Sequence, residues 1–165
     1  MRSLFAFLIA SILLPASANK PAAHVAATAE DPLGGLTRKV FALVNRQRRL
    51  HGVHELAWSD ALAAQAREHS INMMERGFFS HVDPIRGTPA ARLRAAGVPW
   101  SRCGENILRE YGAEDPADDA VERWMKNDSH RQSLLDPLFT HTGVGIAISP
   151  DTEYFITQEF IRPLK

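Results

Sequence analysis

Cysteine is almost absent from this chain, which has only Cys103 in 165 residues. A single cysteine cannot form an internal disulfide, so the fold must be stabilised by its packed core. We interpret Cys103 as a small buried apolar residue, because cysteine is among the residue types most often buried. A nucleophile or a bridge to another chain is the alternative.

An excess of charge and a long hydrophobic run are also missing. Lysine and arginine number 19, aspartate and glutamate number 19, and the formal net charge is +0. This balance excludes a general electrostatic attraction to nucleic acid or to an anionic membrane. The apolar run from Leu4 to Leu14 is too short to span a bilayer. The length suits one domain, and we find no internal repeat.

The N-terminus has the pattern of a secretory signal peptide. Arg2 supplies the positive charge, the run from Leu4 to Leu14 the apolar segment, and Ala16-Ser17-Ala18 a small-residue cleavage site. We therefore predict a signal peptide over residues 1–18, cleavage after Ala18, and a secreted or periplasmic protein without a transmembrane helix. An uncleaved anchor helix is the alternative. Residues 19–35, rich in Ala, Pro, Thr and Gly, predict a flexible tether before a domain at 36–165.

Helical periodicity comes first in the domain and alternating hydrophobicity comes last. Apolar spacing, Ser59 as an N-cap and glycines at helix ends predict helices over 36–51, 60–76, 89–96 and 116–125. Strands are predicted over 103–108, 143–149 and 154–161, and a turn over 133–135. This order indicates an α+β domain with helices flanking a small antiparallel sheet. Gly143 and Gly145 give one strand a small face, which permits close packing against the sheet.

Three ionisable residues lie at junctions between the predicted elements. His81 follows a helix, Glu105 opens a strand, and His130 precedes the predicted turn. Two imidazoles and a carboxylate can hold a zinc ion with an open position, or act as an acid–base pair. Spacing alone leaves surface or structural histidines as the alternative, and His141 is a competing candidate. His69 lies on an apolar stripe, so we interpret it as a core histidine bonded to backbone.

An ordered set of motifs resembles a known family. The motifs are Phe79-Ser80-His81, Gly104-Glu105-Asn106-Ile107, Trp124-Met125, Ser129-His130-Arg131, Leu134-Leu135-Asp136-Pro137, Phe139-Thr140-His141-Thr142-Gly143-Val144-Gly145 and Thr157-Gln158-x-Phe160. Together they resemble the bacterial branch of the CAP superfamily, the SCP-like extracellular proteins that include plant pathogenesis-related protein 1. The resemblance covers about Thr37 to Phe160.

The resemblance implies a three-layer α-β-α sandwich with a small central antiparallel sheet. It also implies a cavity lined by two histidines and two acidic residues, which in some members takes up a divalent metal such as Zn²⁺. By motif, His81, Glu105 and His130 match three of these positions. The fourth position is Asn127, a neutral residue where the family keeps an acid. Zinc held by His81, His130 and Glu105 is therefore expected to bind more weakly than in a full set.

Two functions of different class follow from this sequence. The first is a secreted, monomeric binding module for a divalent metal and/or a lipid, glycan or peptide at the cell envelope, with no nucleic-acid partner. The second is a hydrolase, either metal-assisted or using Glu105 with His81 and His130 as acid and base. No nucleophile–base pair is recognisable, which favours binding and leaves catalysis an open question.

Overall fold

The computed structural model describes residues 33–164. The predicted signal peptide and residues 19–32 of the predicted tether lie outside this range. Five helices and four strands follow in the order α1 (Gly34–Leu50), β1 (Ala57–Trp58), α2 (Asp60–Arg76), α3 (Pro89–Ala95), β2 (Arg102–Tyr111), α4 (Pro116–Lys126), α5 (Asp128–Leu135), β3 (His141–Ile148) and β4 (Glu153–Arg162). Within residues 33–164, no helix has both the length and the apolar character needed to cross a bilayer.

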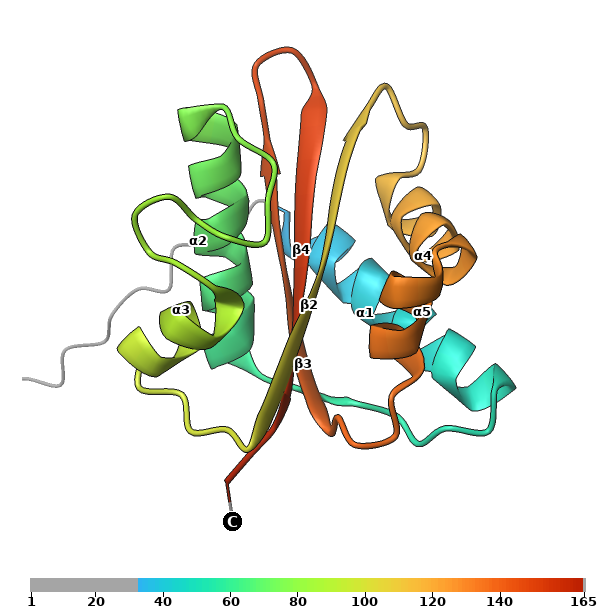
Figure 1. Ribbon diagram of the computed structural model, residues 1–165. Helices are drawn as coiled ribbons and strands as arrows, with labels where there is room; N and C mark the ends of the chain where they lie inside the picture. Colours follow the sequence, from blue (N-terminus) through green and yellow to red (C-terminus); the bar gives the residue numbers. More distant parts are fainter. Residues whose placement is uncertain (1–32, 165) are drawn as a thin grey trace, which may run out of the picture.

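The strands form a single sheet in the order β1-β3-β4-β2. β4 runs antiparallel to both β2 and β3, and the two-residue β1 pairs parallel with the start of β3. Helices α2 and α3 lie on one face of the sheet, and α1, α4 and α5 lie on the other (Figure 1). The predicted three-layer α-β-α sandwich is confirmed, with the short parallel strand as an addition that the sequence analysis did not predict.

The ends of the helices follow from local side-chain chemistry. Ser59 caps α2 by accepting a hydrogen bond from the Leu62 amide, and Gly77 ends it with a φ of 67°. Thr88 caps α3 in the same way. The segment that we predicted as a turn, residues 133–135, is the last part of helix α5, whose N-cap is Asn127.

A hydrophobic cluster fills each side of the sheet. On the α1, α4 and α5 side, Trp124 is fully buried among aliphatic side chains and donates its indole N–H to the Ile107 carbonyl. On the other side, Leu62 and Met73 of α2 and Leu93 of α3 pack against the sheet. A sheet that is buried on both faces fixes the positions of polar side chains at its rim.

Helix α2 packs with its backbone directly on β3. A Cβ atom on Gly143 would lie 2.1 Å from the Ala63 amide nitrogen, and one on Gly145 would lie 1.9 Å from that of Arg67. Only glycine leaves room for this approach. The close packing predicted from the small face of this strand is confirmed.

Candidate functional site

The first two predicted site residues, His81 and Glu105, are hydrogen-bonded to each other. His81 lies in the loop between α2 and α3, and Glu105 lies in β2. Nδ1 of His81 is 2.7 Å from Oε1 of Glu105. The His81 side chain is 47% exposed and that of Glu105 is 1% exposed. The imidazole therefore faces solvent while the carboxyl group that orients it is buried.

His130 completes the predicted trio from the opposite helical layer. It lies in α5, and its ring centroid is 6.5 Å from that of His81. The side-chain amide of Asn106 donates a 3.1 Å hydrogen bond to the His130 carbonyl, which fixes α5 against β2. The structure thus places His81 beside both Glu105 and His130.

The Asp83 side chain holds the loop that carries His81. One carboxylate oxygen of Asp83 accepts hydrogen bonds from the Ile85 and Arg86 amides at 2.8 and 2.9 Å. The other oxygen accepts one from the Asn72 side chain at 3.1 Å. The backbone bonds lower the pKa of this carboxyl group, although burial opposes them. A loop held in this way keeps His81 in place before a ligand arrives.

A buried arginine, which the sequence analysis missed, supports the site from within. The guanidinium of Arg92 pairs closely with Oε2 of Glu105 and lies 3.2 Å from Oε1 of Glu159. Its Nη1 donates to the carbonyls of His81 at 2.9 Å and Gly87 at 3.1 Å. Arg92 therefore positions both the carboxylate and the loop. Glu159 lies in the buried part of strand β4, and a buried carboxyl group requires a buried partner such as Arg92.

The two buried carboxyl groups share one cation, and burial raises the pKa of both. Burial raises the pKa of Glu105 to about 7, against the opposing effect of Arg92. Burial also raises the pKa of Glu159 well above its ordinary value, and the nearby Glu105 adds to this effect. We place the proton on Glu159, because Glu105 has the closer contact with Arg92 and also accepts from His81. Glu105 is then the ionised partner of the imidazole.

Burial lowers the pKa of the histidines near Glu105 and so favours their neutral form. Burial and the charge of Arg92 lower the pKa of His69 to about 4. His69 donates from Nε2 to the Ser80 carbonyl at 3.0 Å, which confirms the predicted core histidine bonded to backbone. Burial also lowers the pKa of His81 and of His130, with Arg92 and His81, respectively, as further causes. Neutral imidazoles keep the lone pair that a metal ion requires.

Asn127, the predicted fourth cavity position, has its side-chain oxygen engaged at a helix end. This oxygen accepts from the amides of Ser129 and His130 at 3.1 and 3.2 Å and from the Ser129 hydroxyl at 2.7 Å. Its part in the cavity remains a prediction. The competing candidate His141 lies at the start of β3, with Nδ1 at 2.9 Å from the Thr140 hydroxyl.

The site offers two imidazoles to a metal ion. Within residues 33–164, no three side chains of His, Cys, Asp or Glu are grouped closely enough to hold a metal. Both oxygens of Glu105 are occupied by His81 and Arg92. A zinc ion would therefore bind through His81 and His130, with the remaining positions filled by water or by a second ligand.

Residues 41–160 match the CAP family, described as the cysteine-rich secretory protein family. The chain is 32% identical over 147 residues to YkwD of Bacillus subtilis (strain 168), a match that covers 89% of this chain and 54% of YkwD. It is 34% identical, with a TM-score of 0.67, to an extracellular protein containing an SCP domain from Bacillus anthracis str. Ames. That match covers 78% of this chain and 40% of the other.

A more distant solved structure shares the fold. It is NaASP2 with Zn²⁺, at 11% identity and a TM-score of 0.59, with 78% of this chain and 80% of that chain covered. The chain spans about half the length of YkwD, and about two fifths of the Bacillus anthracis chain, so it corresponds to one part of these longer relatives. On the matched family and the identity to YkwD, this chain belongs to the CAP, or cysteine-rich secretory protein, family.

Proposed function

We propose that this chain is an exported binding module whose paired imidazoles, His81 and His130, take up a divalent cation of the zinc class. The hydrogen bond from Nδ1 of His81 to the buried Glu105 carboxylate carries the proposal. A carboxylate on one ring nitrogen fixes the tautomer and leaves the other nitrogen free to coordinate, as in metal sites generally. Here Arg92 holds that carboxylate in turn.

The distance between the rings suits a site that closes slightly around an ion. Two imidazoles on one zinc ion have ring centroids about 5 Å apart, given a Zn–N bond of about 2 Å and tetrahedral angles. His81 and His130 are 6.5 Å apart and lie on separate elements. Because the His81 side chain is half exposed, a small side-chain rotation brings the rings within range. NaASP2, which was solved with Zn²⁺, supports the choice of metal.

Two ligands from the protein predict weak, exchangeable binding rather than a structural zinc. Structural sites use four protein ligands and catalytic sites use three. The open positions are available to a donor atom of a bound glycan, lipid head group or peptide. Export is supported by the N-terminal signal pattern and by a relative described as extracellular.

Zinc titration by calorimetry tests the proposal. We expect one zinc ion per chain, and at least tenfold weaker binding in His81→Ala and in His130→Ala. His51→Ala is the matched control, because the His51 ring is exposed and bonds to the carbonyl of Gln47 at the end of α1. Equal zinc uptake by the wild type, His81→Ala and His130→Ala would refute metal binding at this site.

A hydrolase is the second candidate, and the Glu105–His81 pair is the observation in its favour. A buried carboxylate hydrogen-bonded to an exposed imidazole can orient that imidazole as a general acid or base. Because Glu105 is 1% exposed, it would act by orienting His81 and would not touch the substrate. Hydrolysis of peptide, ester or cell-wall substrates should then disappear in Glu105→Gln. Turnover that is unchanged in this variant would argue against the hydrolase.

A further inference from the structure

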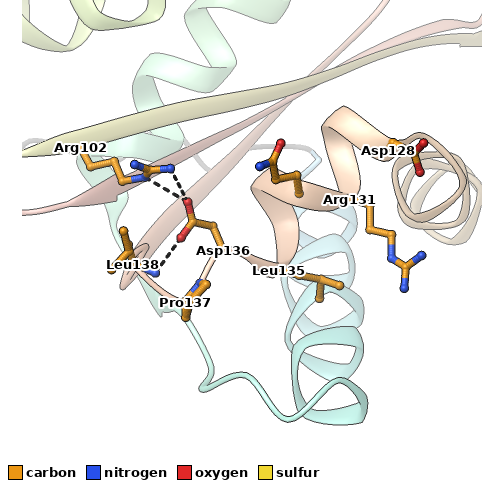
Figure 2. Close-up of a pocket in the computed structure, with 8 residues that line it drawn as sticks. Arg102, Asp128, Arg131, Leu135, Asp136, Pro137 and Leu138 are labelled. Atoms are coloured by element: carbon orange, nitrogen blue, oxygen red, sulfur yellow. Dashed lines mark hydrogen bonds and ion pairs between the residues drawn. The ribbon is translucent and has the colours of Figure 1, made fainter.

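We propose a second binding site, for an extended acidic peptide, in a groove between α5 and the start of β2. Two adjoining cavities, of about 600 and 410 Å³, share Arg102 and Leu138 and form one open groove. We call it the basic groove; its charged lining residues are Arg102, Asp128, Arg131, Asp136 and Arg162. Figure 2 shows the larger part, with Arg102 and Asp136 on one side and Arg131 and Asp128 on the other. Neither cavity is lined by His81, Glu105 or His130.

One wall of the basic groove is held in place by an ion pair. Arg102 lies 2.7 Å from a carboxylate oxygen of Asp136, and the other oxygen accepts from the Leu138 amide at 2.8 Å. The Arg102 guanidinium also lies over the Phe139 ring, 5.4 Å from its centroid. A wall fixed before binding lowers the entropy lost when a ligand is captured.

A buried cation supports the same wall from below. Arg48 has no exposed surface and donates only to backbone carbonyls: those of His54, Leu134, Asp136 and Phe139. Among the described residues, Asp136 is the carboxylate whose charge acts on it, and this carboxylate is already paired with Arg102. The positive charge of Arg48 is therefore only partly balanced beneath the basic groove.

The lining of the groove adds to this positive charge. Arg131 and Arg162 are exposed, and within residues 33–164 their side chains make no hydrogen bond or ion pair. Three arginines face two aspartates along the groove, and Arg48 lies behind them. Because the electric field complements a negative ligand, an anionic partner is selected.

The apolar surface between the arginines indicates what carries the negative charge. Leu135, Pro137, Leu138 and Pro163 line the groove beside the cations. An extended peptide with alternating acidic and apolar side chains presents its acidic groups on one face and its apolar groups on the other, each at a repeat of about 7 Å. β2, which begins at Arg102, is an edge strand of the sheet, and an edge strand can pair with the main chain of an added peptide. The groove is open along its length, which suits a peptide better than an acyl chain.

Fluorescence anisotropy with two labelled heptapeptides tests the proposal. One peptide alternates leucine with glutamate and the other alternates leucine with lysine. We expect the acidic peptide alone to bind, with an affinity that falls as salt is added. Arg131→Glu and Arg162→Glu should each weaken binding at least tenfold. Arg46→Glu is the matched control, because Arg46 is an exposed arginine on α1 that does not line the groove.

Each remaining outcome decides against the proposal. Equal binding of the two peptides, or binding that is unchanged in both groove variants, would overturn it. Binding of sodium oleate or of phosphatidylglycerol vesicles, without binding of the acidic peptide, would assign the groove to an anionic lipid instead. Peptide binding should persist in His81→Ala and His130→Ala. Failure of peptide binding in the basic groove is therefore distinguishable from failure of zinc binding at His81 and His130.

Discussion

The buried trio of Glu105, Arg92 and Glu159 determines how His81 behaves. The Arg92 guanidinium forms ion pairs with both carboxyl groups, and all three side chains are at most 1% exposed. Removing water from two carboxylates beside a single cation is costly, so one carboxyl group keeps its proton. This arrangement leaves Glu105 ionised toward His81, and it makes the stability of the fold depend on pH.

Glu159→Gln tests the shared proton. In the wild type, the raised pKa of Glu159 means that the folded chain binds more protons than the unfolded chain above the usual glutamate pKa of 4.5. The stability that this group contributes is therefore lost as pH rises above 4.5 and through its raised folded-state pKa. Glutamine mimics the protonated side chain, so the variant should avoid this loss and be about 1–3 kcal/mol more stable at pH 9.

Urea unfolding at pH 7 and pH 9 measures this difference. The range is chosen because the lowered pKa of His69, about 4, has the opposite effect. The contribution of His69 to stability is lost only as pH falls below its unfolded-state pKa of 6.5. It therefore does not change between pH 7 and 9. A variant that loses as much stability as the wild type would show that Glu159 is ionised throughout.

Variants of Asn127 distinguish its capping of helix α5 from a role at the zinc site. Its oxygen bonds to the amides of Ser129 and His130 at the start of α5. Asn127→Ala should lower the free energy of unfolding by about 1 kcal/mol, whereas Asn127→Asp keeps the cap and should be neutral or slightly stabilising. Zinc affinity, measured by calorimetry, should stay within about twofold in Asn127→Asp. Markedly tighter binding would place this residue in the cavity.

Single residues differ in how well the sequence predicts them. His81, Glu105 and His130 were predicted from their positions between elements and from motifs, and the structure places His81 beside the other two. Arg92 and Glu159 were not found, because nothing local distinguishes an arginine in a short helix or a glutamate in a strand from a solvent-facing residue. Only the fold shows that both side chains are buried and adjacent.

At the scale of elements, the contact between α2 and β3 holds one helical layer on the sheet. Gly145→Ala should destabilise the protein by about 3 kcal/mol or prevent folding, since the added Cβ would lie 1.9 Å from a backbone nitrogen of α2. Gly35→Ala is the control, because no atom lies within 4 Å of its added Cβ and it is in a helix. Because Gly35 is the second residue of α1, that change should alter stability by no more than about 0.5 kcal/mol. Similar thermal unfolding midpoints for the two variants would contradict the packing account.

Helix α5 shows why one element was predicted wrongly. It has eight residues, of which only Leu134 is buried, so its apolar periodicity is too weak to distinguish it from a turn. The long helices α2 and α4 carry clear caps and apolar faces and were predicted within a residue or two. The parallel strand β1 was missed because two residues carry no periodic signal.

At the scale of the whole molecule, His81 and His130 meet because the sheet lies between two helical layers. His81 comes from the loop between α2 and α3 on one side, His130 comes from α5 on the other, and Glu105 lies in the edge strand β2 between them (Figure 1). The α+β class follows from the order of the elements. The grouping of His81, Glu105 and His130 does not follow from that order. These residues are far apart in the chain and meet only when all three layers are packed.

The whole fold should also be independent of redox conditions. With Cys103 as the single cysteine, the domain is stabilised without an internal disulfide. The thermal unfolding midpoint should therefore be the same with and without a reducing agent. A lower midpoint under reducing conditions would reveal a stabilising bridge between chains.

The central claim is that His81 and His130 act as one site, oriented by the buried Glu105. Zinc titration followed by ¹⁵N-resolved NMR of the histidine side chains tests it most directly. We predict that before zinc is added His81 carries its proton on Nδ1, and that His81 and His130 shift together and saturate at one equivalent. His51 and His141 should stay unchanged. An Nε2 proton on His81, or two rings that respond at different zinc concentrations, would contradict the account.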